Sequence, residues 1–223
     1  MLTSPAPKLP SFDRPQSLRA RVTDALRLAV VSGEMVPGRL YSAPMLALQL
    51  GVSSTPVREA MLDLVKEGLV EAIRNKGFLV TNLSQDDRAD LTELRCLIEV
   101  PTIGKIARTA STSSVEALRP LAESIIQVAD ESNFTEFVQL DRQFHLDLLA
   151  LAGNRFLVEC VGEMRSRSRL AFLREGQDMS LLTRAAREHI ELIDLLVARD
   201  ARRAEALIRE HIVGHIDGAP TPV

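Results

Sequence analysis

Residues 40–65, LYSAPMLALQLGVSSTPVREAMLDLV, constrain the fold of this chain most, because they predict two short helices joined by a tight turn. Ser42 is suited to cap the first helix, and Pro44 fits its first turn, where a missing N–H costs nothing. Ser54 or Thr55 is expected to cap the second helix, whose apolar residues recur at helical spacing on one face: Val57, Ala60, Met61, Leu64 and Val65. The pattern is typical of a helix-turn-helix, which places the start of its second helix against base edges in the DNA major groove. A helical hairpin that only packs is the alternative.

Two β-strands are predicted directly after this stretch, at residues 69–73 and 78–80. The residues between them, Arg74-Asn75-Lys76-Gly77, combine a turn-forming Asn and Gly with two cations. This arrangement predicts a β-hairpin with a basic tip, which a pair of packing helices does not need. It therefore favours a DNA-binding wing beside the two helices.

Residues 32–80 resemble the winged helix-turn-helix of the GntR superfamily, which has similar PG-x-x-L, VS-x-TPVREAL and EGLV motifs and a wing glycine. The resemblance implies a double-stranded DNA operator as partner, contacted by seven residues of the second helix and the wing: Ser53, Ser54, Thr55, Arg58, Arg74, Asn75 and Lys76. Two positions depart from the family, because Pro44 and Ser54 stand where relatives commonly have arginine. We therefore expect an unusual operator sequence, or recognition that relies more on the wing and on DNA shape.

The charge of the chain is unevenly divided, although its net value is only −3. Residues 1–82 contain ten Lys and Arg against seven Asp and Glu, or +3, and the remainder contains 17 against 23, or −6. A basic reader joined to an acidic body fits contact with DNA phosphates through one end of the molecule. No apolar run reaches about 18 residues, the length of a membrane span, and no signal peptide is evident, so we expect a cytoplasmic protein without membrane contact.

The chain divides into four regions: a flexible leader at 1–15, a winged helix-turn-helix domain at 16–82, an all-α domain at 83–218 and a tail at 219–223. The predicted fold class is mostly α, with a small β-hairpin wing and a C-terminal helical bundle. Six helices are expected in the second domain, the first two disturbed by Pro101 and Pro120: Ser84–Thr109, Ser113–Ser132, Thr135–Ala152, Arg155–Arg174, Met179–Arg199 and Ala201–Asp217. Together with the reader, this body resembles the FCD domain of the FadR subgroup, and the count of six resembles its VanR-like branch.

Polar residues on the apolar stripes of these helices indicate a buried site. Asp141 and His145 lie one turn apart on the stripe of the third helix, and His189 and His211 fall on apolar faces of the last two. Burying an ionised Asp without a partner is costly, whereas one carboxylate and three neutral imidazoles suit a borderline divalent cation. A set of hydrogen-bonded core histidines is the alternative.

The FCD resemblance implies the same assignment, because the metal ligands of that subgroup are an Asp and a His four residues apart and a His on each of two later helices. The matching residues are Asp141, His145, His189 and His211. Zinc, nickel and manganese are all admissible ions for such a ligand set. His215, one turn beyond His211, could replace a ligand or lie outside the ligand set.

The resemblance also implies a small carboxylate effector that binds beside the metal. Arg95 and Glu99 stand in an R-x-x-x-E context that the subgroup often places near a bound carboxylate, which a guanidinium can bind bidentately. Arg165, in the run MRSRSR, is a further candidate, and most of that run is expected to form a solvated face. The alternative is a plain Arg95–Glu99 ion pair on a partly solvated helix face.

These observations predict a metabolite-responsive transcriptional regulator, with repression as its expected mode, that binds a pseudo-palindromic operator as a homodimer. The alternative is a metal-dependent hydrolase with the DNA reader as an accessory, because an Asp/His cluster can also activate water. The sequence contains no H-E-x-x-H motif, nucleophile elbow or phosphate loop. We therefore expect a sensor and not an enzyme.

Overall fold

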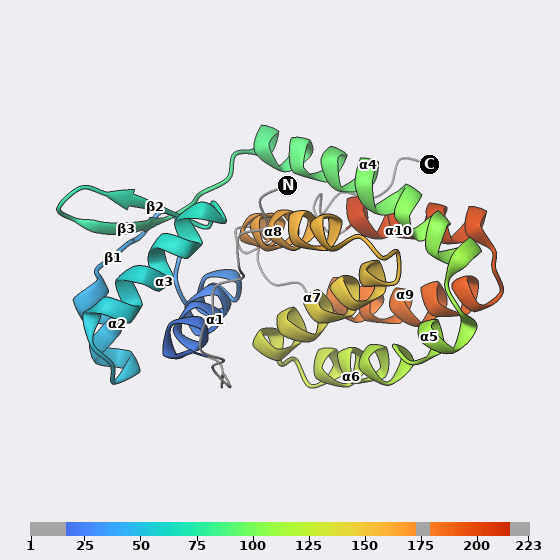
Figure 1. Ribbon diagram of the computed structural model, residues 1–223, viewed down its shortest axis with the longest axis horizontal. Coiled ribbons are helices and arrows are strands. Elements are labelled where there is room, and N and C mark those ends of the chain that lie inside the picture. Colours follow the sequence, from blue (N-terminus) through green and yellow to red (C-terminus); the bar gives the residue numbers. More distant parts are fainter. Residues whose placement is uncertain (1–16, 173–178, 215–223) are drawn as a thin grey trace, which may run out of the picture.

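The computed structural model describes residues 17–172 and 179–214. A winged reader comes first, comprising α1 (Leu18–Val31), β1 (Leu40–Tyr41), α2 (Ala43–Leu50), α3 (Ser54–Lys66), β2 (Val70–Ile73) and β3 (Gly77–Val80). A helical body follows, comprising α4 (Gln85–Thr109), α5 (Thr112–Glu116), α6 (Arg119–Asp130), α7 (Phe134–Ala150), α8 (Arg155–Phe172), α9 (Met179–Val197) and α10 (Ala201–Gly214). Figure 1 shows the reader on the left and the body on the right. The predicted fold class is confirmed, whereas the expected leader, the tail and His215 lie outside the described residues.

The caps of the helix-turn-helix agree with the prediction for α2 and differ for α3. Ser42 Oγ accepts a 3.3 Å hydrogen bond from Met45 N, and Gly51 ends the helix in the left-handed conformation at φ 65°. The cap of α3 is Ser53, so the expectation of Ser54 or Thr55 was wrong. Ser53 makes no side-chain capping bond. A proline occupies the third position of this helix and has no N–H to donate.

The wing is a three-stranded antiparallel sheet in the order β1-β3-β2, where the sequence predicted only the hairpin of β2 and β3. β1 pairs through two residues, Leu40 with Leu79 and Tyr41 with Phe78, which is too short for a strand periodicity to be recognised. At the tip, the wing glycine has φ 133°, and a Cβ on it would overlap the carbonyl oxygen of Tyr41. The close approach of β1 therefore explains why glycine stands there.

The body contains the six predicted helices, but the second is divided into α5 and α6. The break comes just before Pro120, which lies in the first turn of α6, where its missing N–H is tolerated. α4 continues through Pro101 and is not split. All the body helices contribute to its core, and the fully buried side chains include Ile103, Ile106, Ile125, Phe137, Phe144, Leu148, Ile193 and Ile212. Within residues 17–172 and 179–214, no helix has the length and apolar character that a membrane crossing requires.

The reader and the body are joined by the chain connection and by direct packing. A short segment leads from β3 into α4, which begins with a capping box in which Ser84 Oγ accepts from Asp87 N and Ser84 N donates to the Asp87 carboxylate. In addition, α1 packs against α7 and α8 of the body, as Figure 1 shows at the centre of the molecule. The body can therefore act on the reader both through the chain connection and through direct packing.

Candidate metal centre and nucleic-acid interface

Four predicted ligands meet in the interior of the body. Asp141 and His145 extend from α7, His189 from α9 and His211 from α10, and all four residues are buried. One potential ligand atom from each lies within 4.8 Å of the others. The helical periodicity therefore located the cluster correctly, because the apolar faces of three helices converge on it.

The distances between histidine nitrogens match donors that share one ion, and those from Asp141 are slightly longer. Nε2 of His145 lies 3.1 Å from Nε2 of His189 and 3.1 Å from Nε2 of His211. Asp141 Oδ1 lies 3.5 Å from His189 Nε2 and 3.8 Å from His145 Nε2. Two donors at about 2.0–2.1 Å from one ion are about 2.9–3.4 Å apart in octahedral or tetrahedral geometry. The alternative is that His145 Nε2 forms hydrogen bonds to both other histidines. A single ring nitrogen has only one proton or one lone pair and cannot form both bonds well, so a shared ion explains the convergence better.

The surroundings keep the His145 imidazole neutral and orient that of His211. Burial, reinforced by the positive charge of Arg165, holds the pKa of His145 well below its usual range, so the ring stays available as a neutral ligand. His211 Nδ1 lies 2.8 Å from Glu188 Oε2, which favours a proton on Nδ1 and leaves the Nε2 lone pair facing the cluster. Phe144 packs on His189 with ring centroids 4.5 Å apart. Sequence reasoning did not identify Glu188, because its partner lies on another helix.

The predicted effector residues form a buried ion-pair cluster. Arg95 Nε donates a 2.7 Å hydrogen bond to Glu99 Oε1, and Arg165 Nη1 lies 3.6 Å from Glu99 Oε2. The exposed fraction of the side chain is 6% for Arg95, 8% for Arg165 and 1% for Glu99. The plain Arg95–Glu99 pair is therefore present, but on a buried and not a solvated face. The charges of both arginines act on His145, which places the ion-pair cluster close to the metal candidate.

Two expectations about these helices were wrong. Most of the MRSRSR run is not a solvated face, because Arg165 is buried in the ion pair and Ser166 and Ser168 are buried as well. On α4, the spacing of Leu91, Leu94, Arg95 and Ile98 predicts one inward stripe, but Leu94 is 48% exposed. Arg95 is buried as that stripe predicts, and the packing of α4 against α8 and α10 also turns Arg88 and Glu99 inward. Tertiary packing thus selected a polar stripe that apolar periodicity alone did not reveal.

The predicted DNA-contact residues lie at the outer surface of the reader. Ser53, Thr55 and Arg58 are exposed at the start of α3, and Ser54 is half-buried. Their helix turns its buried face, Val57, Ala60, Met61 and Leu64, toward the rest of the reader. All three residues of the wing tip, Arg74, Asn75 and Lys76, are exposed. The structure thus leaves both groups accessible from outside.

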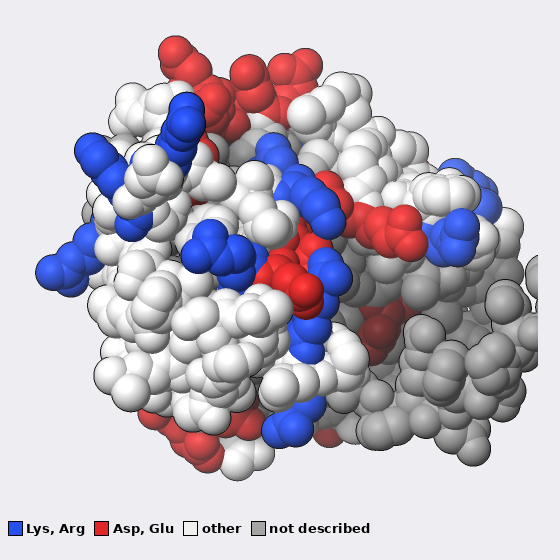
Figure 2. Space-filling model, turned by 60° about the vertical axis from the view of Figure 1, so that its left-hand side comes forward, with Lys and Arg blue, Asp and Glu red and all other residues white. Residues whose placement is uncertain are grey.

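Cations are distributed unevenly over the reader. Helix α2 has no charged residue, and its outward side chains Met45 and Leu48 are 41% and 85% exposed. Figure 2, which turns this end of the molecule forward, shows Lys and Arg in several separate groups and no continuous basic patch. The face in Figure 2 therefore shows no single basic surface to which DNA phosphates would be drawn.

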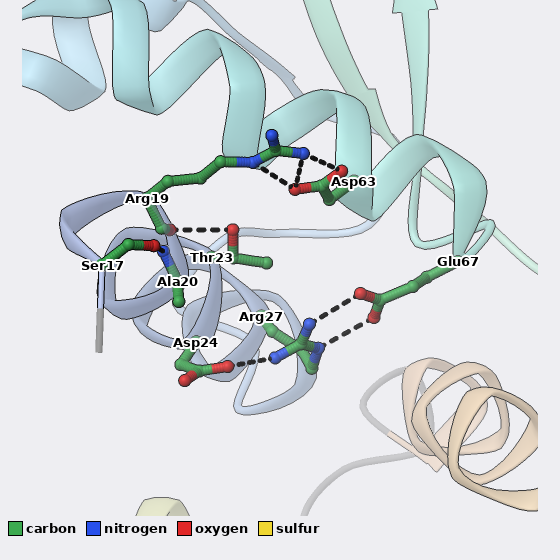
Figure 3. Close-up of a pocket in the computed structure, with 8 residues that line it drawn as sticks. All are labelled: Ser17, Arg19, Ala20, Thr23, Asp24, Arg27, Asp63 and Glu67. Atoms are coloured by element: carbon green, nitrogen blue, oxygen red, sulfur yellow. Dashed lines mark hydrogen bonds and ion pairs between the residues drawn. The ribbon is translucent and has the colours of Figure 1, made fainter. Parts of the chain in front are cut away.

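A crevice of about 530 Å³ lies between α1 and α3, away from the histidines (Figure 3). Arg19 makes a bidentate pair with Asp63 at 2.8 and 2.6 Å, and the pKa of Asp63 is lowered chiefly by this guanidinium. Arg27 lies between Glu67 and Asp24, with hydrogen bonds to both. Since its charged groups are bonded to one another, we interpret the crevice as the brace of α3 on α1 and not as a ligand site.

Comparison with known proteins gives the family of the chain. Residues 18–80 match the family described as bacterial regulatory proteins, gntR family, and residues 90–214 match the FCD domain. The Nta operon transcriptional regulator of Aminobacter aminovorans is 31% identical over 190 residues, which cover 84% of this chain and 87% of that protein. A probable D-xylose utilization operon transcriptional repressor of Paenarthrobacter nicotinovorans is 25% identical over 200 residues, covering 90% of this chain and 88% of that protein.

A solved structure supports the fold independently of sequence identity. E. coli McbR/YncC matches with a TM-score of 0.79 at 23% identity, over 90% of this chain and 95% of that one. The matched family and relatives are transcriptional regulators and not enzymes, as the sequence predicted. The chain therefore belongs to the GntR family of bacterial transcriptional regulators, in the FadR-like group whose DNA reader is followed by an FCD domain.

Proposed function

We propose that this DNA-binding regulator is a metal-dependent sensor of a small carboxylate, whose binding in the FCD domain changes the affinity of the reader for its operator. The observation that carries the proposal is the convergence of Asp141, His145, His189 and His211 beside the buried Arg95–Glu99–Arg165 cluster. Repression is the proposed mode, and one relative is itself described as a repressor.

The metal would be held by one carboxylate oxygen and three imidazole nitrogens. Such a donor set accepts zinc, nickel or manganese, and when bound the ion would supply a Lewis acid that attracts an anionic ligand. Glu188 supports the assignment, because metal-binding histidines usually donate their second ring N–H to a carboxylate or carbonyl. The burial of His145 favours its neutral form, which is the form that binds metal.

Arg95 is the proposed guanidinium partner of the carboxylate. Its bond to Glu99 uses Nε, so the two terminal nitrogens of the group take no part in that bond. Arg165 approaches the same glutamate from α8 at 3.6 Å, and we propose it and Glu99 as the other members of the effector pocket. A bound carboxylate would then compete with Glu99 for the arginines and rearrange contacts between α4 and α8.

DNA recognition is proposed for the start of α3 and the wing. Arg58 is the only cation of α3 near its N-terminus, and Ser53, Ser54 and Thr55 precede it in the sequence. From the wing, Arg74, Asn75 and Lys76 would reach the adjacent groove or backbone. One winged domain buries too little surface for tight specific binding, so we propose a homodimer on a pseudo-palindromic operator.

The proposal is tested by selecting an operator from random DNA with the metal-loaded protein and then measuring operator affinity across a panel of small carboxylates at fixed salt. At least one carboxylate should change the affinity by about 5- to 150-fold, the usual range of allosteric coupling. If neither any carboxylate nor removal of the metal changes the affinity for the selected operator, the cluster has only a structural role. Turnover of small esters, amides or phosphates by the purified protein would favour the hydrolase alternative.

A further inference from the structure

The C-terminal end of α3 lies against helix α8 of the body. Nε of Arg167 donates a 2.7 Å hydrogen bond to the carbonyl oxygen of Glu67. The next residue, Gly68, has φ 70°, and a Cβ built on it would overlap the Arg167 guanidinium. Glycine therefore provides both the left-handed backbone and the space in which this guanidinium lies.

The same two residues are tied firmly into the reader. Both carboxylate oxygens of Glu67 accept hydrogen bonds from Arg27 of α1, at 2.8 and 2.6 Å (Figure 3). The carbonyl oxygen of Gly68 accepts a 3.0 Å bond from the hydroxyl of Thr81, where the segment leading to α4 begins. A displacement at Glu67 and Gly68 would therefore reach α1, the reading helix and the connection to the body.

The two body helices that face this point also carry the proposed sensing residues. On α8, Arg165 of the effector cluster stands two residues before Arg167. On α7, Arg142 directly follows the candidate ligand Asp141 and packs close to Gly162 of α8.

We propose that the state of the sensing site is transmitted to the reading helix by α8 through the contact of Arg167 with Glu67 and Gly68. This inference rests on the proposed function, and it adds a route that bypasses the covalent connection at residues 81–84. Arg167 is then a positioning residue: it contacts neither DNA bases nor the effector and sets where the end of α3 lies. A rearrangement at Arg165 moves the same turn of α8 that carries Arg167, because a helix behaves as a rigid element over two residues.

Amide hydrogen exchange of the full-length protein tests the route, with zinc alone as the probe. Exchange is measured for residues 62–72 in chelator-treated protein before and after one equivalent of zinc, while calorimetry on the same samples measures zinc binding. In the wild type, zinc should slow exchange in this segment by about threefold or more, because it stabilises the packing of α8 on α3. Arg167→Ala should bind zinc with unchanged stoichiometry and lose most of the protection.

Arg155→Ala is the matched control, because it removes an exposed arginine at the other end of the same helix. It should behave as the wild type. Arg167→Lys guards against misfolding: it keeps the charge, lacks the planar group that lies against Gly68, and should also lose most of the protection.

Full protection in both Arg167 variants, or zinc binding to the wild type without any protection, would overturn the route and leave the covalent connection and the packing of α1 on α7 and α8 as the links. If the wild type does not bind zinc, calorimetry is repeated with nickel and with manganese, and failure to bind any of the three would overturn the proposed function, and the inference with it. The calorimetric measurement distinguishes these two failures.

Discussion

Glu188 Oε2 lies 2.8 Å from Nδ1 of His211, while Nε2 of the same ring faces His145. The carboxylate fixes the ring orientation and increases the basicity of the nitrogen on the other side, which strengthens a metal ligand. Glu188→Ala should therefore weaken zinc binding by about 10- to 100-fold in a competition titration with a chelating dye. The exposed neighbour Glu191 provides the control, since Glu191→Ala should leave the affinity unchanged. Equal affinity of the two variants would remove Glu188 from the metal centre.

Metal occupancy is predicted to depend on the four-residue cluster. Protein purified without chelator should contain about one divalent ion per chain, and His189→Ala or Asp141→Ala should lower occupancy by about tenfold or more. Because an ion that binds only the folded state stabilises it, zinc at 100 times its Kd should stabilise the wild type by about 2.7 kcal/mol. Elemental analysis and thermal unfolding measure the two effects. Full occupancy in the double Asp141/His189 variant would identify the cluster as a polar core only.

The sequence predicted the candidate metal cluster because residues at helical spacing on an apolar stripe lie on the buried face of the helix. Asp141 and His145 share a face simply because they are four residues apart, and the body must bury that face. Which helices meet there is decided by tertiary packing. Apolar spacing turned His189 and His211 inward, and the family resemblance implied the same grouping with Asp141 and His145. Glu188 was missed because its contact with α10 has no signal in local spacing.

Short and polar features of the fold were less predictable. β1 pairs through two residues, fewer than an alternation pattern needs. Ser53, Ser54 and Thr55 are all residue types that commonly cap a helix, so the sequence does not single out Ser53. Ser53 caps α3 by its backbone conformation and makes no side-chain capping bond. The MRSRSR run was expected to be solvated because arginines rarely lie inside. Glu99 of α4 and the backbone of Glu67 supply the partners that allow Arg165 and Arg167 to be buried or half-buried.

Arg58 is predicted to contribute directly to operator recognition. It is exposed at the start of α3 and lies where the helix would enter the major groove. Arg58→Ala should weaken specific operator binding by about 1–3 kcal/mol without changing thermal stability. Arg202→Ala, an exposed arginine of α10 at the far end of the body, is the control in the same salt-controlled shift assay. An operator affinity that survives Arg58→Ala unchanged would exclude this residue from recognition.

The DNA complex is predicted to contain two chains. Sedimentation should show a dimer at the concentrations used for binding, and footprinting should show two protected half-sites about one helical turn apart. The reason is energetic: a single winged domain covers too little DNA for tight specific binding. A monomer that protects one half-site with full affinity would contradict the prediction.

The account is tested most directly by the change in operator affinity that a carboxylate causes in three proteins: the wild type, Arg95→Ala and Asp141→Ala. A ligand shifts the equilibrium only by its differential affinity for the two states, so the wild type should change by about 5- to 150-fold. Both variants should bind the operator without ligand as the wild type does and lose the response, because one lacks the guanidinium and the other a metal ligand. A full response in both variants would contradict the account, since the carboxylate would then act without the Arg95 cluster or the metal.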